Sequence, residues 1–179
     1  MKGLVFTEFI DMVDERFSLE TSERLIEACD LPSGGIYTSI GTYDAQEMRT
    51  LVARLSEMTG VPAADLLNAF GRHLFSRFVS SFPEFFEGIG STLEFLPRVE
   101  EYIHLEVRKL YPDAELPTFT CTVPQPGTLV MIYRSTTNMP DLAEGLMQAC
   151  IEHFGDALVV TRETRAGDPP ETVFTLLPP

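Results

Sequence analysis

Hydrophobic positions along the first two thirds of the chain follow the period of amphipathic helices. Apolar side chains recur there every three or four residues, which places them on one face of a helix. Five helices are predicted, over residues 3–17, 19–29, 45–59, 62–78 and 91–111. Pro97 can bend the last of them, and the SSFPEFFEG stretch at 80–88 is expected to form a loop or a short helix.

The helix over 45–59 carries the clearest boundary signals. Asp44 precedes it and is a good N-cap, because its carboxylate accepts hydrogen bonds from the free backbone N–H groups of a first helical turn. Glu47 follows three residues later, as in a capping box. Gly60 is the expected C-terminal stop, since glycine readily adopts the left-handed conformation that ends many helices.

After Pro112 the pattern changes to short segments that are rich in threonine and valine. Such segments, separated by turn residues, are typical of β-strands. Four strands are predicted, over residues 118–123, 128–135, 157–163 and 171–177, with a helix at about 140–154 between the second and the third. The sequence therefore predicts an α+β fold, with helices first and a four-stranded antiparallel sheet with helices after them.

Acidic side chains outnumber basic ones by 27 to 13, which gives a formal net charge of −14. Such a surface repels phosphate backbones and anionic lipids, so neither nucleic acid nor a membrane is an expected partner. The opening MKGLVFTEFIDMVDERF is interrupted by acids, unlike a signal peptide, and no apolar run approaches the roughly 18 residues of a membrane span. A soluble cytoplasmic protein is expected.

The sequence lacks the motifs of common enzymes and of zinc sites. It contains no G-x-S-x-G, no HExxH and no phosphate-binding glycine loop, so we expect that the chain is not an enzyme. Its three cysteines, Cys29, Cys121 and Cys150, are widely spaced and form no CxxC pair. We therefore expect neither a zinc site nor a disulfide framework.

One histidine, His104, lies within the stretch VEEYIHLEVRKLYP, at the edge of the apolar stripe of a predicted helix. From this spacing alone, a half-buried histidine with one hydrogen bond is the commoner interpretation, and Glu100 and Glu101 are expected on an exposed face. A zinc site needs three or four protein ligands, whereas haem iron needs one, often a histidine, together with apolar walls. The pattern leaves a structural histidine and a haem ligand both open.

A series of short motifs occurs in order along the whole chain. They are MKGLVF at the start, GVPAADLLNAFGRHLF at 60–75, SFPEFF at 81–86, YIHLEVRKLYP at 102–112, LP at 116–117, IYRS at 132–135 and AEGLMQA at 143–149. In this order the chain resembles the H-NOX family, the haem–nitric oxide/oxygen binding domains that include the regulatory haem domain of soluble guanylate cyclase. The resemblance implies one domain over 1–179, with a helical distal subdomain over about 1–60, a proximal subdomain over about 61–179 and a haem pocket between them.

The resemblance implies that His104 is the axial ligand of haem b, with its second ring nitrogen donating to a backbone carbonyl or water. The family binds the haem propionates through a Tyr-x-Ser-x-Arg motif. Tyr133 and Ser135 match this motif, but Thr137 stands in place of the arginine. Arg134 is a further candidate for haem binding, although a strand should point it to the face opposite Tyr133 and Ser135.

The resemblance also implies apolar residues around the macrocycle. Pro117 is expected to contact it, and the residues expected on the distal side are Val5, Phe9, Leu74, Phe78, Leu142 and Leu146. Family members that bind dioxygen place a tyrosine hydroxyl where Leu142 stands here. An apolar distal wall offers O₂ no hydrogen-bond donor, so the resemblance implies a five-coordinate ferrous haem that takes nitric oxide and CO but not O₂.

A sensor of this kind must act through another protein, because the chain carries no kinase, cyclase or phosphodiesterase motif. By resemblance the partner is a histidine kinase or a cyclic-di-nucleotide enzyme, and weakening of the bond between His104 and iron is the expected trigger. Two alternatives stay open. One is a degenerate H-NOX fold that has lost haem and binds proteins, which Thr137 favours, and the other is a carrier of a different apolar ligand.

Overall fold

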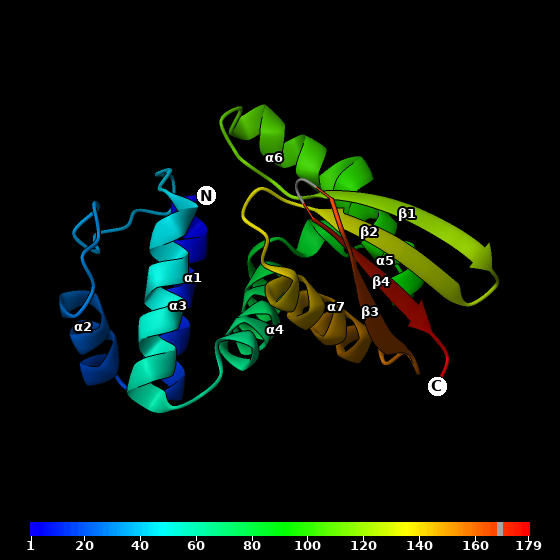
Figure 1. Cartoon of the computed structure of the whole chain (residues 1–179). Coiled ribbons are helices and arrows are strands. Elements are labelled where there is room, and N and C mark those ends of the chain that lie inside the picture. Colours follow the sequence, from blue (N-terminus) through cyan, green and yellow to red (C-terminus); the bar gives the residue numbers. More distant parts are fainter. Residues whose placement is uncertain (168–169) are drawn as a thin grey trace.

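The structure, a computed structural model, describes residues 1–167 and 170–179. Its helices are α1 (Gly3–Arg16), α2 (Leu19–Glu27), α3 (Ala45–Thr59), α4 (Ala63–Ser81), α5 (Thr92–Arg98), α6 (His104–Leu110) and α7 (Pro140–Phe154), with a 3₁₀ turn η1 (Pro83–Phe85) and a π-helical segment η2 (Val99–Ile103) (Figure 1). Its strands are β1 (Thr118–Gln125), β2 (Thr128–Arg134), β3 (Val159–Arg165) and β4 (Glu171–Leu177). The predicted α+β fold is confirmed.

The boundaries of the helix α3 confirm two of the three signals in its sequence. The carboxylate of Asp44 accepts a hydrogen bond from the backbone N–H of Gln46 at 2.8 Å, and Gly60 ends the helix with a φ of 73°. The prediction that Glu47 completes a capping box is wrong. Glu47 is buried, and its carboxylate accepts hydrogen bonds from the hydroxyls of Tyr37 and Ser33 in the preceding loop instead of turning back to the helix end.

The predicted helix over 91–111 is interrupted in its middle. The α-helical pattern of α5 ends at Arg98, directly after Pro97, which lacks the N–H that a continuous helix would use. The chain then widens into η2 and returns to α-helix at His104. A π-helical segment of this kind is rare and often lies at a functional site.

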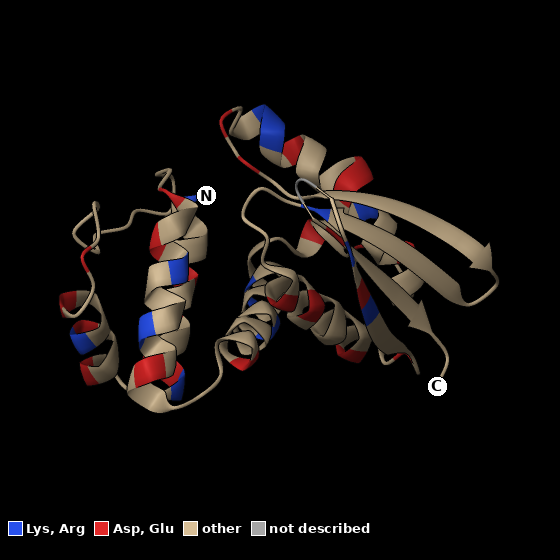
Figure 2. Cartoon of the chain, in the orientation of Figure 1, with Lys and Arg blue, Asp and Glu red and all other residues tan. Residues whose placement is uncertain are grey.

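The sheet is antiparallel throughout, with the strand order β1-β2-β4-β3. Figure 1 shows α1, α2 and α3 at one end of the molecule, the sheet with α5 and α6 at the other, and α4 and α7 between them. The helices α4 and α7 therefore join the two ends of the molecule. Charge is unevenly distributed, since β1 and β2 carry almost no charged residues, whereas the helices carry many of both signs (Figure 2).

Two glycines bring α4 and α7 into close contact. A Cβ atom on Gly71 would lie 2.3 Å from the carbonyl oxygen of Leu142, and one on Gly145 would lie 2.1 Å from that of Asn68. Both distances are far below van der Waals contact, so each helix needs a residue without a side chain at the crossing. The crossing fixes the relative position of the two ends of the molecule.

The described residues form two hydrophobic cores. The first is built from α1 to α4 and contains Phe9 and Leu74, whereas the second joins α5, α7 and the sheet and contains Phe95 and Phe174. Leu146 of α7 packs against both. Within residues 1–167 and 170–179, no helix combines the length and the apolar character that crossing a membrane requires.

Candidate functional site

His104 is the first residue of α6, directly after the π-helical segment η2. It is 8% exposed, and its ring centroid lies 5.9 Å from that of Phe119 on β1. Burial lowers the pKa of His104 below its usual range, although the carboxylate of Glu100 opposes the shift. The imidazole is therefore neutral at neutral pH, with one ring nitrogen that donates and one that carries a lone pair.

Glu100 determines which nitrogen donates. Its Oε2 atom lies 2.9 Å from Nδ1 of His104, so the hydrogen is on Nδ1 and the lone pair is on Nε2. Among the residues that the structure describes, none forms a hydrogen bond with Nε2. A buried neutral histidine with one nitrogen fixed and the other free can serve as a metal ligand.

The sequence did not reveal the role of Glu100, which was expected on an exposed helical face. Its carboxylate is mostly buried and also accepts hydrogen bonds from Arg108 at 3.1 Å and from the backbone N–H of Phe119 at 3.2 Å. Burial raises the pKa of Glu100, but the hydrogen bonds with His104, with Arg108 and with the backbone of Phe119 outweigh it and hold the pKa below its ordinary value. The spacing of four residues to His104 was the signal that could have shown the contact.

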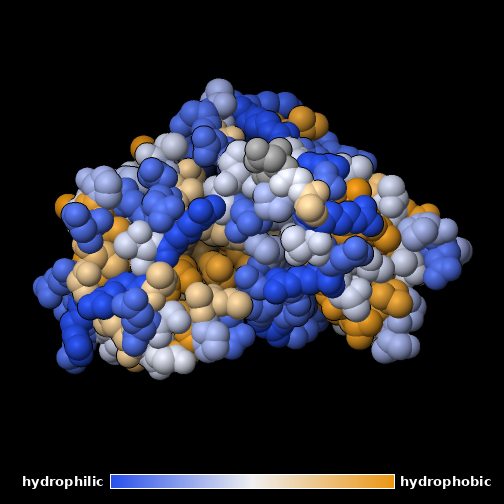
Figure 3. Space-filling view, in the orientation of Figure 1, coloured by the Kyte–Doolittle hydropathy of each residue, from blue (hydrophilic) through white to orange (hydrophobic). Residues whose placement is uncertain are grey.

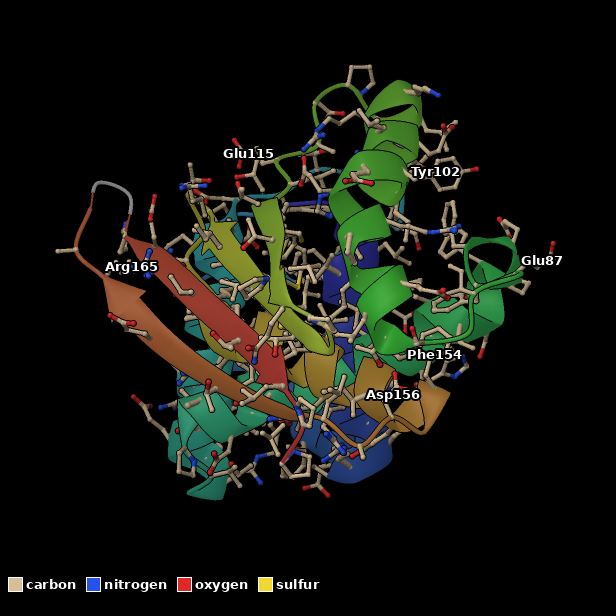
Figure 4. The ribbon with its side chains drawn as sticks, turned by 90° about the vertical axis from the view of Figure 1, so that its right-hand side faces the viewer. Glu87, Tyr102, Glu115, Phe154, Asp156 and Arg165 are labelled. Atoms are coloured by element: carbon tan, nitrogen blue, oxygen red, sulfur yellow. The ribbon has the colours of Figure 1, made fainter. Side chains whose placement is uncertain are left out.

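Neighbouring residues on the same turn face outwards. Tyr102, the second residue before His104, is 50% exposed and points away from the sheet (Figure 4). Its ring packs against that of Phe85 in η1, with 5.8 Å between the centroids. The π-helical segment therefore directs His104 into the protein and Tyr102 out of it.

Tyr133 and Ser135 lie at the end of β2 and in the loop that follows. The hydroxyl of Tyr133 is buried and accepts a hydrogen bond from the backbone N–H of Met139 at 3.0 Å. Within the described residues its own hydrogen has no acceptor, so it remains available to an anion. The hydroxyls of Ser135 and Thr137 lie 2.8 Å apart. The structure brings these polar groups together near the first turn of α7.

Arg134 points to the other face of the sheet, as expected for a residue between Tyr133 and Ser135. Its guanidinium donates to Glu171 at 2.6 Å and to Thr120 at 3.2 Å. The structure therefore does not bring Arg134 together with the other candidate residues. Pro117 is half-buried in the loop before β1, two residues before Phe119, whose ring faces His104.

The six residues expected on the distal side all belong to one apolar region. Phe9 and Leu74 are buried in the first core, and Val5, Phe78, Leu142 and Leu146 are partly buried and pack against it. They come from α1, α4 and α7. Figure 3 shows hydrophobic side chains gathered between α3 and the first turns of α7, with hydrophilic ones around them.

The chemistry of these groups fits haem. A neutral imidazole nitrogen can bind iron, hydroxyl donors can bind propionates, and half-buried apolar side chains can cover a macrocycle. His104 would hold the iron, Tyr133 and Ser135 would bind a propionate, and the distal residues would line the opposite face. The structure thus offers each kind of contact that haem requires.

Comparisons with known proteins agree with this chemistry. A family model described as haem-NO-binding matches residues 2–162. The structure of an Fe(II) unliganded H-NOX protein from K. algicida is 41% identical, has a TM-score of 0.92 and covers 99% of this chain and 96% of its own. The IWP-051-bound H-NOX from Shewanella woodyi in the Fe(II)CO state is 36% identical, with a TM-score of 0.84 and coverage of 100% and 95%. No curated protein sequence matches the chain.

A more distant structure shares the fold as well. The H-NOX protein from S. oneidensis in the Fe(II)NO state is 23% identical, with a TM-score of 0.86 and coverage of 98% of each chain. The match to the family model spans most of the chain, and the two relatives above 30% identity align along nearly all of it. This protein therefore belongs to the H-NOX family of haem-binding gas-sensor domains.

Proposed function

We propose that this chain is a sensor whose ferrous haem b is held by His104 and takes nitric oxide and CO but not O₂. The observation that carries the proposal is the state of His104, which is buried and neutral, with Nδ1 held by Glu100 and Nε2 free of hydrogen bonds to the described residues. Haem, when bound, would supply an iron atom that can bind diatomic gases. The ferrous K. algicida relative, at 41% identity, supports this oxidation state.

The apolar distal wall supports the choice of ligands. Leu142 lies in the first turn of α7, packed against the first core, where a tyrosine would offer a hydroxyl. Without a donor, bound O₂ gains no hydrogen bond, whereas nitric oxide and CO depend on one far less. The family description supports nitric oxide as a ligand, and the Fe(II)CO state of the S. woodyi relative supports CO.

A path for signalling starts at His104. Glu100 binds His104 on one side and both Arg108 of α6 and the backbone of β1 on the other. If the imidazole of His104 moved with bound iron, or dissociated from it, the Glu100 contacts that join α6 to the sheet would change. The two resulting arrangements of α6 and the sheet would differ in affinity for a partner protein. We propose that this partner is a histidine kinase or a cyclic-di-nucleotide enzyme.

The test is the absorption spectrum of the purified protein, supplied with haem and reduced without air, before and after nitric oxide, CO or O₂ is added. We expect a sharp Soret band that shifts with nitric oxide and CO but not with O₂. His104→Ala should abolish the band, and His153→Ala, an exposed histidine on α7, is the matched control that should keep it.

Two results would overturn the proposal. A stable complex with O₂ in the unchanged protein would contradict the ligand selectivity. A protein that circular dichroism shows to be folded but that takes up no haem would favour one of the two alternatives. These are a haem-free H-NOX fold that binds proteins, which Thr137 in place of arginine supports, and a carrier of another apolar ligand.

A further inference from the structure

The loop that follows β2 lacks a cation at the motif position of Thr137. The Thr137 hydroxyl is engaged with that of Ser135, at 2.8 Å, and a neutral hydroxyl gives a weaker hydrogen bond to a carboxylate than a guanidinium does. Haem carries two propionates, and this chain already has a net charge of −14. A haem site here therefore needs a positive charge from elsewhere in the structure.

Arg49 of α3 reaches this loop from the other end of the molecule. Its Nη2 atom donates to the backbone carbonyl of Thr137, 88 residues further along the chain. Arg49 and Thr137 both line a groove of about 500 Å³ between the start of α3 and the loop after β2. Among the described residues that line this groove, Arg49 is the one lysine or arginine.

Most hydrogen-bond donors of the Arg49 guanidinium are not used by the contact with Thr137. It carries five N–H groups, of which the contact with Thr137 uses one, and within the described part of the chain it forms no ion pair. Three carboxylates line the groove. Asp44 caps α3, Asp113 accepts from Thr42 at 2.7 Å and pairs with Lys2 at 3.7 Å, and Glu115 forms no ion pair with Arg49. Arg49 is thus a cation at the loop that needs one, without a fixed anionic partner.

We propose that Arg49 takes the place of the missing motif arginine and binds a haem propionate. The inference rests on the proposed function, because it presupposes haem at His104. The planar guanidinium forms two parallel hydrogen bonds to a carboxylate, and Tyr133 and Ser135 add hydroxyl donors from the sheet side. The propionate is then held from both ends of the molecule, by α3 and by the loop after β2, so a shift between the ends changes its contacts.

The experiment measures the rate at which haem leaves the protein for a high-affinity haem scavenger. Arg49→Ala should accelerate the loss by about tenfold or more, as expected when a charge-assisted contact is removed. Arg54→Ala is the matched control, since Arg54 lies on the same helix and pairs with Glu57 at 2.7 Å, and its rate should equal that of the unchanged protein. Thr137→Arg added to Arg49→Ala should restore slow loss.

A second arm separates propionate binding from a structural role of Arg49. The same rates are measured with haem dimethyl ester, which lacks the propionate charges. We expect Arg49→Ala to accelerate the loss of ordinary haem and to leave the loss of the ester unchanged. Equal acceleration for both, or none for either, would overturn the inference. Haem ligation is read separately, from the spectra of the unchanged protein and of His104→Ala with nitric oxide, so a failure here is distinguishable from a failure of haem ligation by His104.

Discussion

The carboxylate of Glu100 lies 2.9 Å from Nδ1 of His104, across the π-helical segment that precedes α6. The same carboxylate accepts hydrogen bonds from Arg108 and from the backbone of Phe119. The orientation and the electron density of the imidazole therefore depend on α6 and on β1 together. In this way Glu100 connects the proposed iron ligand to the elements that would carry a signal.

Replacing Glu100 by glutamine should raise the reduction potential of bound haem. A carboxylate acceptor increases the electron density on the imidazole, which favours ferric iron, and a neutral amide does so less. Spectroelectrochemistry of Glu100→Gln should show an increase of tens of millivolts. Glu101→Gln, one residue along and with no hydrogen bond to His104, is the control, and an equal shift in both variants would show that the effect is only one of net charge.

Leu142→Tyr should allow O₂ to bind. The new hydroxyl would stand on the first turn of α7, on the distal side, and would donate a hydrogen bond to the bound gas. Oxygen titration of the reduced protein, followed by absorption, measures the affinity. Leu142→Phe adds a ring without the hydroxyl and should remain unable to bind O₂, so a gain of binding in the phenylalanine variant would mean that pocket size, not the donor, decides.

Gly145→Ala should destabilise the fold. Its Cβ would lie 2.1 Å from the carbonyl oxygen of Asn68, so α4 and α7 must move apart at their crossing. Overpacking of this kind costs about 1–3 kcal/mol, which chemical denaturation can measure. Gly90→Ala is the control, since its Cβ would come no closer than 3.7 Å to another group, and it should unfold at nearly the same denaturant concentration as the unchanged protein.

Tyr37 should titrate at a higher pH than an ordinary tyrosine. Burial raises the pKa of Tyr37 to about 12, although a hydrogen bond from Ser33 opposes this effect. Because the folded protein favours the protonated phenol, the contribution of Tyr37 to stability is complete below about pH 10 and is lost as the pH rises towards 12. Ultraviolet titration should show a late component that Tyr37→Phe removes, and its persistence in that variant would assign it to another tyrosine.

Local sequence signals predicted the elements well because each depends on neighbouring residues. Asp44 and Gly60 mark the ends of α3 through bonds within a few residues, and the helix over 140–154 has its predicted bounds. The four strands follow from their own composition, and each begins and ends within two residues of its predicted position. Such features require no knowledge of the rest of the fold.

Contacts across the fold were not predictable in this way. Glu47 fits a capping box in the sequence, but Tyr37 and Ser33, from a separate loop, compete for its carboxylate. Arg49 lies 88 residues from Thr137, and no local pattern links them. The residues of the candidate site were identified by resemblance, whereas the partners that surround them became visible in the folded chain.

The most direct test of the central claim is chemical rescue at His104. The variant His104→Gly is supplied with haem, reduced without air and examined by absorption with and without added imidazole. We predict that the Soret band of the unchanged protein is lost in the variant and returns when imidazole fills the space of the deleted ring. A full-strength, unshifted band in the variant without imidazole would contradict the assignment of His104 as the iron ligand.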